Sequence, residues 1–412
     1  MKYKSVLQKA GLVVTSILLS LLLAELVLRF IYPAQTYYFV WQPNLQHTFT
    51  PDPAIIEGVK SPSSFTINSY GVRTDADEIR HGEEALWFWQ RKGKTDSVWA
   101  AWCCLCLGGS TTECLYLDDK ATWPAQLEKM SCNGPKSMWC PLMGNIGKSG
   151  STSRENYVQL KYCVPQYKKV SDVILMVGLN DLVKRLSQDT LFDNSFHFTQ
   201  ASEDSFVTKI FLKQGRGIGF TWWRRTALFY VLQKAFHHRN GVAWQQMEDD
   251  KGEVYKTWRE NRQNAAIVID TLPDLTTALN EYVRNLNLMI DEAQKQKLQI
   301  TFVNQSALWK DTMTENELAM LWMGGTGNFQ VEKRHSYYSP KALRHGLNLY
   351  NEKLAEVCAK RNVLLIDIDS KLPHNASTFY DDCHFTITGA QKVGQIVFEG
   401  MKNNMSGNNL KK

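Results

Sequence analysis

A serine, a glycine-rich turn, an amide and an Asp-x-x-His pair in this chain could together perform nucleophilic catalysis. They stand in the segments "LGGSTTE" (107–113), "GNIGKSGSTS" (144–153), "GLND" (178–181) and "DDCH" (381–384). A serine hydroxyl is a weak nucleophile until a base accepts its proton, and a histidine oriented by a carboxylate can be that base. The four segments therefore predict a site for acyl transfer.

Each of these residues has one expected task. Ser110 would attack a carbonyl carbon while His384 accepts its proton, and Asp381 would hold the imidazole in the tautomer that can accept it. The tetrahedral intermediate carries an oxyanion, which needs hydrogen-bond donors already in place. We expect these donors to be the backbone N–H of Ser110, the backbone N–H of Gly150 and the side-chain amide of Asn180.

Each segment also has a simpler structural explanation. A serine after two glycines often caps a helix, a Ser-Gly pair is common in turns, and Asp181 is expected to hold a loop. Asp382 is an alternative to Asp381 as the partner of His384. Glu113 could point into the site, but a surface position is expected. The catalytic interpretation is favoured because the four segments each follow a predicted strand.

Strands and helices are predicted to alternate around these segments. Apolar runs predict buried parallel strands, and apolar residues at helical spacing predict the helices between them. Active sites of such sheets lie beyond the carboxyl ends of the strands, where these polar segments stand. The sequence therefore predicts an α/β fold with helices on both faces of a parallel sheet. The expected strands lie within residues 98–108, 138–147, 170–178, 298–305 and 362–368, and the expected helices within 121–130, 153–164, 275–290 and 343–357.

The N-terminal segment predicts a membrane anchor. Residues 11–32, "GLVVTSILLSLLLAELVLRFIY", form an apolar run long enough to span a bilayer. Lys2, Lys4 and Lys9 precede it, which places the N-terminus in the cytoplasm and the rest of the chain outside, in the periplasm or the extracellular space. We expect residues 1–33 to be an uncleaved anchor, and a cleaved signal peptide is the alternative.

The composition bounds the function classes. The chain has 412 residues, of which 44% are apolar, enough for one large α/β domain or two smaller ones. The net charge of +6 is mild and no nucleic-acid motif is visible, so we expect no nucleic-acid partner. Among nine cysteines, Cys132 and Cys140 are expected to pair, whereas Cys103, Cys104 and Cys106 are expected to be buried apolar residues. No zinc-type spacing occurs, and we expect neither a metal nor an organic cofactor.

The four segments, in this order, resemble the SGNH (GDSL-type) hydrolases, whose blocks carry Ser, Gly, Asn and His. The segment 122–128, "TWPAQLE", is similar to the stretch that follows the nucleophile in that family, and 67–73, "INSYGVR", is similar to a lead-in of its membrane-anchored members. Gly109 stands where many members have Asp. The resemblance covers residues 67–181 and 275–400.

The resemblance implies a flavodoxin-like, three-layer α/β/α sandwich around a parallel sheet of about five strands. It also implies a serine esterase that cleaves carboxylic esters, commonly acetyl or acyl groups on carbohydrate or lipid, with no cofactor. Two alternatives remain open. The chain could be an O-acyltransferase in cell-envelope polysaccharide modification, or a membrane-tethered binding protein without catalytic activity. The physiological ester and the oligomeric state stay unassigned.

The resemblance leaves one long segment unmatched. Residues 185–265 are too long for a simple crossover, and they are expected to form an inserted cap or subdomain. Basic and aromatic residues alternate there, with no acidic residue between Asp204 and Glu248. A solvated basic face is expected, and contact with anionic lipid or polymer is the alternative. The remaining expected parts are a lead-in at 34–97, a hydrolase domain at 98–184 and 266–402, and a polar tail at 403–412.

Overall fold

The structure is a computed structural model in which the four motif segments are all described. The predicted strands at 98–108 and 138–147 are described from residues 103 and 142 onward. The described residues are 2–31, 36–74, 103–132, 142–167, 170–188, 191–193, 197–215, 226–229, 231–232, 242–243, 249–333 and 335–409.

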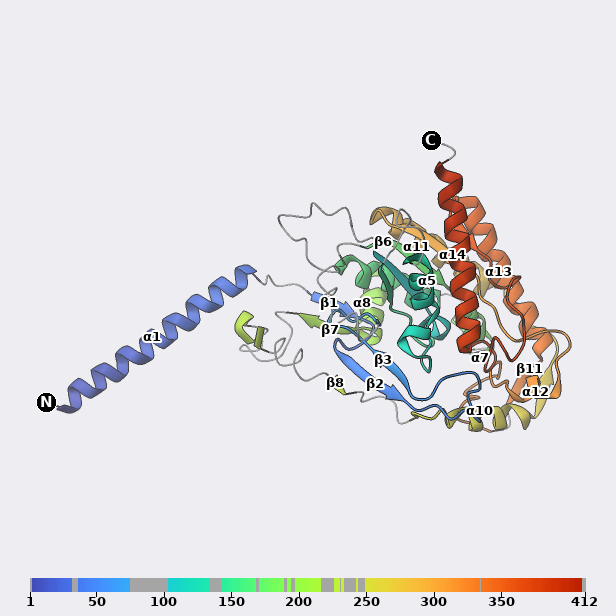
Figure 1. Ribbon diagram of the computed structural model, residues 1–412, viewed down its shortest axis with the longest axis horizontal. Helices are drawn as coiled ribbons and strands as arrows, with labels where there is room; N and C mark the ends of the chain where they lie inside the picture. The colour runs from blue at the N-terminus through green and yellow to red at the C-terminus, as the bar shows by residue number, and fades with distance from the viewer. Residues whose placement is uncertain are drawn as a thin grey trace.

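A five-stranded sheet forms the centre of the molecule, and its neighbouring strands all run parallel (Figure 1). Its order is β12-β10-β6-β4-β5, which in chain order is the 2-1-3-4-5 arrangement of flavodoxin-like folds. The predicted parallel sheet of about five strands is therefore confirmed. The strands are β4 (Cys103–Gly108), β5 (Leu142–Asn145), β6 (Val170–Met176), β10 (Gln299–Val303) and β12 (Leu364–Ile366).

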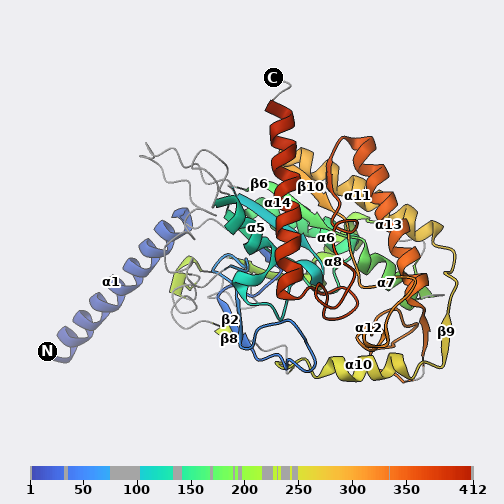
Figure 2. The ribbon, with the colours of Figure 1, turned by 45° about the vertical axis from the view of Figure 1, so that its right-hand side comes forward.

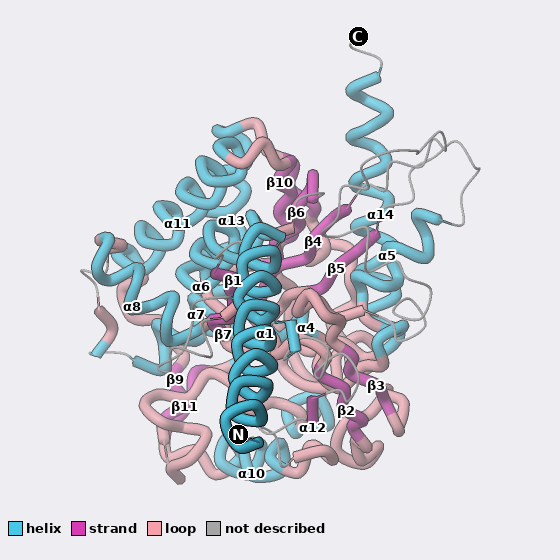
Figure 3. Tube along the Cα trace, turned by 90° about the vertical axis from the view of Figure 1, so that its left-hand side faces the viewer, coloured by secondary structure: helices cyan, strands magenta, loops and turns pink. Residues whose placement is uncertain are grey.

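Helices cover both faces of this sheet, so the predicted three-layer α/β/α sandwich is confirmed. Helices α5 (Trp123–Cys132) and α14 (Ile387–Asn409) lie on one side, and α6 (Ser153–Val158), α11 (Thr276–Lys295) and α13 (Pro340–Arg361) lie on the other (Figure 3). Because both faces are covered, the strands are mostly apolar, and residues 104–107 of β4 are fully buried. Helix α7 (Leu179–Gln188) follows β6 directly.

Helices α5 and α14 approach each other closely at a glycine. A Cβ atom on Gly394 of α14 would lie 2.9 Å from the Cβ of Gln126 and 3.1 Å from the backbone N of Leu127, both in α5. Any larger side chain there would push the two helices apart. Helix α14 continues to Asn409, into the stretch that was expected to be a polar tail.

The lead-in and the long inserted segment share two small sheets. Strand β1 (Thr36–Phe39) pairs antiparallel with β7 (Leu212–Gly215), and β2 (Leu45–Phe49) lies between β3 (Ser63–Thr66) and β8 (Val242–Ala243). In the described residues, strands of the lead-in therefore pair directly with strands of the insertion.

The other described elements of the insertion and its surroundings pack on the main domain. They are α8 (Gln200–Ile210), α10 (Val254–Gln263), α12 (Glu315–Ala319) and the parallel pair β9 (Ile267–Ile269) and β11 (Ser336–Tyr338). Most of the basic and aromatic stretch lies outside the described residues, namely 216–225, 230, 233–241 and 244–248.

Helix α1 (Lys2–Ile31) projects away from the rest of the molecule (Figures 1 and 2). Residues 8–31 are long and apolar enough to cross a membrane, and no residue in the apolar 18-residue stretch within them is buried. Glu25 pairs with Arg29 one turn later at 2.7 Å, and its carboxylate accepts the backbone N–H groups of Ala227 and Leu228 at 3.0 Å. The helix is therefore a candidate membrane anchor or signal sequence.

The cysteines follow the expected pattern where they are described. Cys132 is disulfide-bonded, and its expected partner, Cys140, lies outside the described residues. Cys104 and Cys106 are fully buried in β4.

Candidate active site

Ser110 is the first residue of a short helix at the carboxyl end of β4. Strand β4 ends at Gly108, whose φ of 152° is rarely adopted by residues with a side chain. A Cβ atom there would lie 2.4 Å from Oγ1 of Thr112 and 2.7 Å from the carbonyl oxygen of Met176. Only glycine fits at this position, where the chain leaves β4 and turns into α4 (Ser110–Glu113).

Asn180 lies against the backbone just before the serine. It stands in the first turn of α7, and its Nδ2 atom would be only 2.3 Å from a Cβ atom on Gly109. The same nitrogen donates a hydrogen bond to the carbonyl oxygen of Ser151 at 2.8 Å. The Asn180 amide therefore bridges the turn that carries Ser110 and the loop that follows β5.

Gly150 lies in this loop with open space in front of it. Its φ is 76°, and no heavy atom lies within 4 Å of the position that a Cβ would take. The loop is fixed to the sheet because Lys148 N donates to the carbonyl oxygen of Gly108 at 3.1 Å. Its far end is held by Asp181, which accepts both the backbone N–H and the hydroxyl of Ser153. As expected, Asp181 holds a loop.

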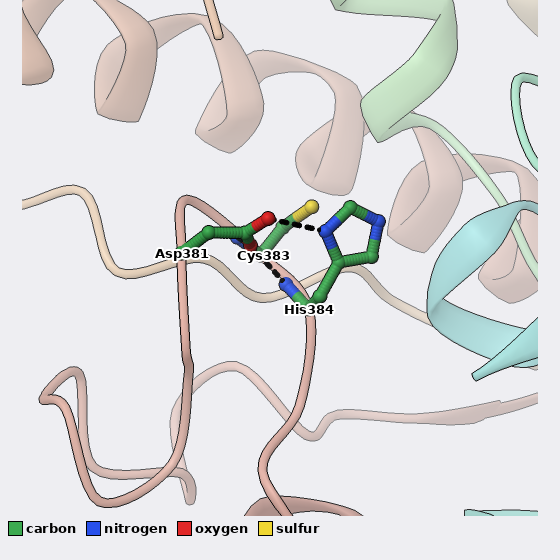
Figure 4. A group of neighbouring side chains, drawn as sticks. All are labelled: Asp381, Cys383 and His384. Carbon is green, nitrogen blue, oxygen red and sulfur yellow. Dashed lines mark hydrogen bonds and ion pairs between the residues drawn. The ribbon is translucent and has the colours of Figure 1, made fainter. Parts of the chain in front are cut away.

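His384 and Asp381 form a hydrogen-bonded pair in the turn before α14 (Figure 4). Nδ1 of His384 lies 2.6 Å from Oδ2 of Asp381, and the backbone N–H of His384 donates to Oδ1 at 2.8 Å. Two further donors are Cys383 N at 2.9 Å and the indole Nε1 of Trp322 at 2.9 Å. The carboxylate is fully buried and has four donors. It therefore holds the imidazole by Nδ1, and Nε2, on the other side of the ring, takes no part in the bond to Asp381.

Asp382, the alternative partner, points away from the imidazole. Its carboxylate accepts the indole N–H of Trp309 at 2.7 Å and the backbone N–H groups of Trp322 and Met323 at 2.7 and 3.1 Å. Asp382 therefore connects loops, and the geometry assigns Asp381 as the partner of His384.

The surroundings of His384 make it a stronger base. Burial lowers its pKa, but the charge and the hydrogen bond of Asp381 outweigh this effect, so the pKa of His384 lies above its ordinary value of 6.5. Burial raises the pKa of Asp381, whereas its interactions with His384 lower it to about 2 overall. The imidazole also stacks on Tyr380, with ring centroids 5.6 Å apart, and meets the edge of Tyr255 at 6.5 Å.

Glu113 is buried, and the expectation of a surface position was wrong. Its residue is 2% exposed, and its carboxylate accepts the hydroxyl of Ser149 in the Gly150 loop. Burial raises the pKa of Glu113, against the opposing charge of Lys148, and Glu113 in turn contributes to the raised pKa of His384. Its position was not predictable because a charged residue at the end of a short helix is usually solvated.

The loop after β10 links the serine group to the histidine pair. Its Gln305 bonds the hydroxyl of Thr111 at 3.3 Å, and its Leu308 N donates to the carbonyl oxygen of Asp382 at 2.8 Å. Among the described residues no hydrogen bond joins Ser110 and His384. Catalytic hydrogen bonds are often long before substrate binds, so this shared loop is the contact that relates the two groups.

Asp381, Cys383 and His384 could in principle hold a metal ion, because one ligand atom from each lies within 4.8 Å of the others. A thiol binds metal as the thiolate, but burial and the neighbouring carboxylates raise the pKa of Cys383 well above its ordinary value. The imidazole Nδ1 and the Asp381 carboxylate already bond each other. The three residues fit a hydrogen-bonded pair better than a metal site, and Cys383 is a poor nucleophile for the same reason.

Three aromatic residues around the pair did not emerge from the sequence. Trp322 lies 59 residues before Asp381 in the chain, and no motif surrounds it. Tyr255 belongs to α10, which falls in the segment that matched nothing. Tyr380 is adjacent to the Asp-x-x-His turn, so its position next to that motif was the one available signal.

No family model and no curated protein matches this chain. Solved structures align with it only at low similarity. A member of the lipolytic protein G-D-S-L family from Veillonella parvula is 12% identical, with 73% of this chain and 97% of that chain covered and a TM-score of 0.37. An acetylxylan esterase from Geobacillus stearothermophilus is 13% identical, with 72% and 93% covered and a TM-score of 0.38. An alpha/beta hydrolase enzyme from the metagenome of Lake Arreo is 13% identical, with 73% and 96% covered and a TM-score of 0.39.

Proposed function

We propose that this chain is a serine hydrolase of the SGNH type that cleaves carboxylic esters through an acyl-enzyme on Ser110. One observation carries the proposal. Ser110 begins α4 at the carboxyl end of β4, and the loop after β10 bonds both this helix, at Thr111, and the turn that carries His384, whose Nδ1 atom lies 2.6 Å from the buried Asp381. In open parallel sheets this edge is where ligands bind, at the point where the strand order reverses between β4 and β6.

The first half-reaction forms the acyl-enzyme. His384 Nε2 accepts the proton of the Ser110 hydroxyl while the serine oxygen bonds to the ester carbonyl carbon. The imidazolium that results is stabilised by the Asp381 carboxylate, which stays ionised throughout. When the tetrahedral intermediate collapses, the carbon–oxygen bond to the alcohol breaks, and His384 returns its proton to the departing oxygen.

The oxyanion of the intermediate would be held by three donors. The backbone N–H of Ser110 is one, because it is the first N–H of α4 and has no partner within so short a helix. Asn180 can supply a second, since only one of its two amide protons is needed for Ser151. Gly150 would supply the third from a backbone that faces open space. The second half-reaction repeats these steps with water and releases the acid.

The substrate class follows from the resemblance and from α1. An uncleaved α1 would place the catalytic domain outside the cytoplasm beside the membrane. Acetyl or acyl esters of envelope carbohydrate or lipid are the class of substrate within its reach. The same acyl-enzyme could pass its acyl group to a sugar hydroxyl instead of water.

The test uses the full-length chain in detergent and a fluorophosphonate probe, with the adduct located by peptide mass. We expect labelling at Ser110 that is lost in Ser110→Ala and in His384→Ala. Ser171→Ala is the matched control, because Ser171 lies at the opposite end of β6. Absence of labelling in a folded wild-type sample would overturn the proposal in favour of a binding role. Product analysis with an added sugar acceptor then separates hydrolysis from acyl transfer.

A further inference from the structure

Arg73 of the lead-in is buried beside the nucleophile helix and makes an unusual number of contacts. Its residue is 4% exposed, and its guanidinium donates to four backbone carbonyl oxygens and one carboxylate. Three of the four carbonyls belong to the segment that follows Ser110. The acceptors are the carbonyl oxygens of Glu113, Cys114 (2.9 Å), Leu117 and Ser64 (3.3 Å) and Oδ1 of Asp119 (2.8 Å).

Helix α4 cannot hold its own shape. It has four residues, and a helix of one turn has too few internal hydrogen bonds to be stable alone. Its last carbonyl groups have no partners within the helix. Asn145 donates to the carbonyl oxygen of Thr112 at 2.7 Å, and Arg73 donates to those of Glu113 and Cys114. Side chains from outside the helix therefore supply its C-terminal hydrogen bonds.

Arg73 is itself held in one position. Its Nε atom pairs with Asp119, which also accepts the backbone N–H of Thr66 at 3.2 Å. Its guanidinium lies 4.3 Å from the centroid of the Phe65 ring. Its backbone N–H donates at 2.9 Å to the carbonyl oxygen of Asn145, the residue that ends β5 and begins the Gly150 loop. One residue thus joins the lead-in, the nucleophile helix and the loop that carries an expected oxyanion donor.

We propose that Arg73 is a positioning residue for the reaction, which fixes α4 so that the Ser110 hydroxyl and N–H stay aimed at the substrate. The inference rests on the proposed function and adds to it a role for the lead-in. Arg73 has no hydrogen bond with Ser110, Asn180 or His384 among the described residues, so it acts on the site through α4. A planar guanidinium with five donors suits this task, because lysine offers a single charged centre.

The kinetic test compares variants of the full-length chain in detergent, with p-nitrophenyl acetate as the ester. In Arg73→Met the helix loses its donors, and a misplacement of about 1 Å costs about 10²-fold in rate. We expect kcat to fall by about that factor while KM stays within about threefold, since Arg73 contacts no substrate. Arg73→Lys should give a smaller fall.

Arg344→Lys is the control for the loss of a bidentate, partly buried ion pair. Arg344 donates two hydrogen bonds to Asp369, at 2.9 and 2.7 Å, and among the described residues it has none with α4. Both Arg73→Lys and Arg344→Lys should lower the Tm, but only Arg73→Lys should lower kcat. Equal kcat losses in the two variants, or a folded Arg73→Met with wild-type kcat, would overturn the inference.

Hydrogen exchange separates this inference from the proposed function. Amide exchange across residues 110–117 should be faster in Arg73→Met than in the wild type, whether or not the chain turns over an ester. Faster exchange in a chain that never labels or hydrolyses would reject the hydrolase and keep Arg73 as the support of α4. Unchanged exchange in an active enzyme would reject Arg73 and keep the hydrolase.

Discussion

At the scale of single residues, the Asp381 carboxylate decides how His384 behaves. Four donors surround it, so it remains ionised in a fully buried position, where an unpaired charge would be costly. Its charge favours the protonated imidazole, and it raises the pKa of His384 although burial opposes this. A base of this kind accepts a proton readily. As the pH falls, however, it becomes protonated, and stops acting as a base, at a higher pH than an ordinary histidine does.

The pH dependence of fluorophosphonate labelling follows from the upward shift of the His384 pKa. His384 can accept a proton only while it is neutral, so activity rises as the pH passes upward through its pKa. Because the folded protein raises that pKa, the midpoint of the acid limb should lie above 6.5, the ordinary value. Asp381→Asn removes the charge, so the midpoint should move down while the rate falls by about 10⁴-fold. The fluorophosphonate labelling rate measured across pH checks both, and a wild-type midpoint at or below 6.5 would contradict the assignment.

Trp322 should change the acid limb of the same pH–rate profile, because it bonds Asp381. In Trp322→Phe the carboxylate loses the indole donor at 2.9 Å, becomes more basic and holds the imidazolium more strongly. The acid limb should move to higher pH, and the rate at neutral pH should fall by about tenfold, the value of one hydrogen bond to a charged group. Trp258→Phe is the control. The ring centroids of Trp258 and Trp322 lie 4.4 Å apart, but Trp258 has no hydrogen bond to Asp381 among the described residues. A pH profile that moves equally in both variants would assign the effect to packing.

At the scale of elements, the first residues of α7 and the turn after β4 work as one unit. The Asn180 amide occupies the space where a side chain on Gly109 would lie. Glycine at position 109 therefore leaves this space to the Asn180 amide, and a side chain there would have to displace it. The absence of a side chain at 109 and the presence of an amide at 180 are two parts of one arrangement.

A double substitution tests this coupling. Gly109→Ala should displace the Asn180 amide, because the new Cβ would lie 2.3 Å from its Nδ2 atom. Asn180→Ala should lower kcat by about 10²–10³-fold, the usual cost of one oxyanion donor. If Gly109→Ala acts by moving that amide, the double variant should lose little more than Asn180→Ala alone. Multiplicative losses measured in kcat would show that the two residues act separately.

At the scale of the whole molecule, the parts that follow local pattern were predictable and the long-range contacts were not. Buried apolar runs predicted the five parallel strands, and Ser110 and Asn180 were selected as candidates because each follows one of those strands directly. The contact of Trp322 with Asp381 and the bonds of Arg73 to α4 join residues far apart in the chain, where no periodicity or spacing signals them. The pairing of β1 with β7 is of the same kind, since register between distant strands depends on the folded core.

The role of α1 is also a property of the whole molecule, because it decides on which side of a membrane the site works. An uncleaved anchor predicts that the full chain, with its N-terminal peptide intact, stays in the membrane fraction during alkaline extraction. Leu18→Arg combined with Leu22→Arg places two charges near the helix centre, each costing about 2.5–3.5 kcal/mol on insertion scales, and should abolish retention. The conservative pair Leu18→Ile and Leu22→Ile should keep it.

A soluble chain whose first peptide begins beyond residue 31 would instead identify α1 as a cleaved signal sequence. The site would then reach esters at any distance from the membrane, and the substrate search would widen accordingly.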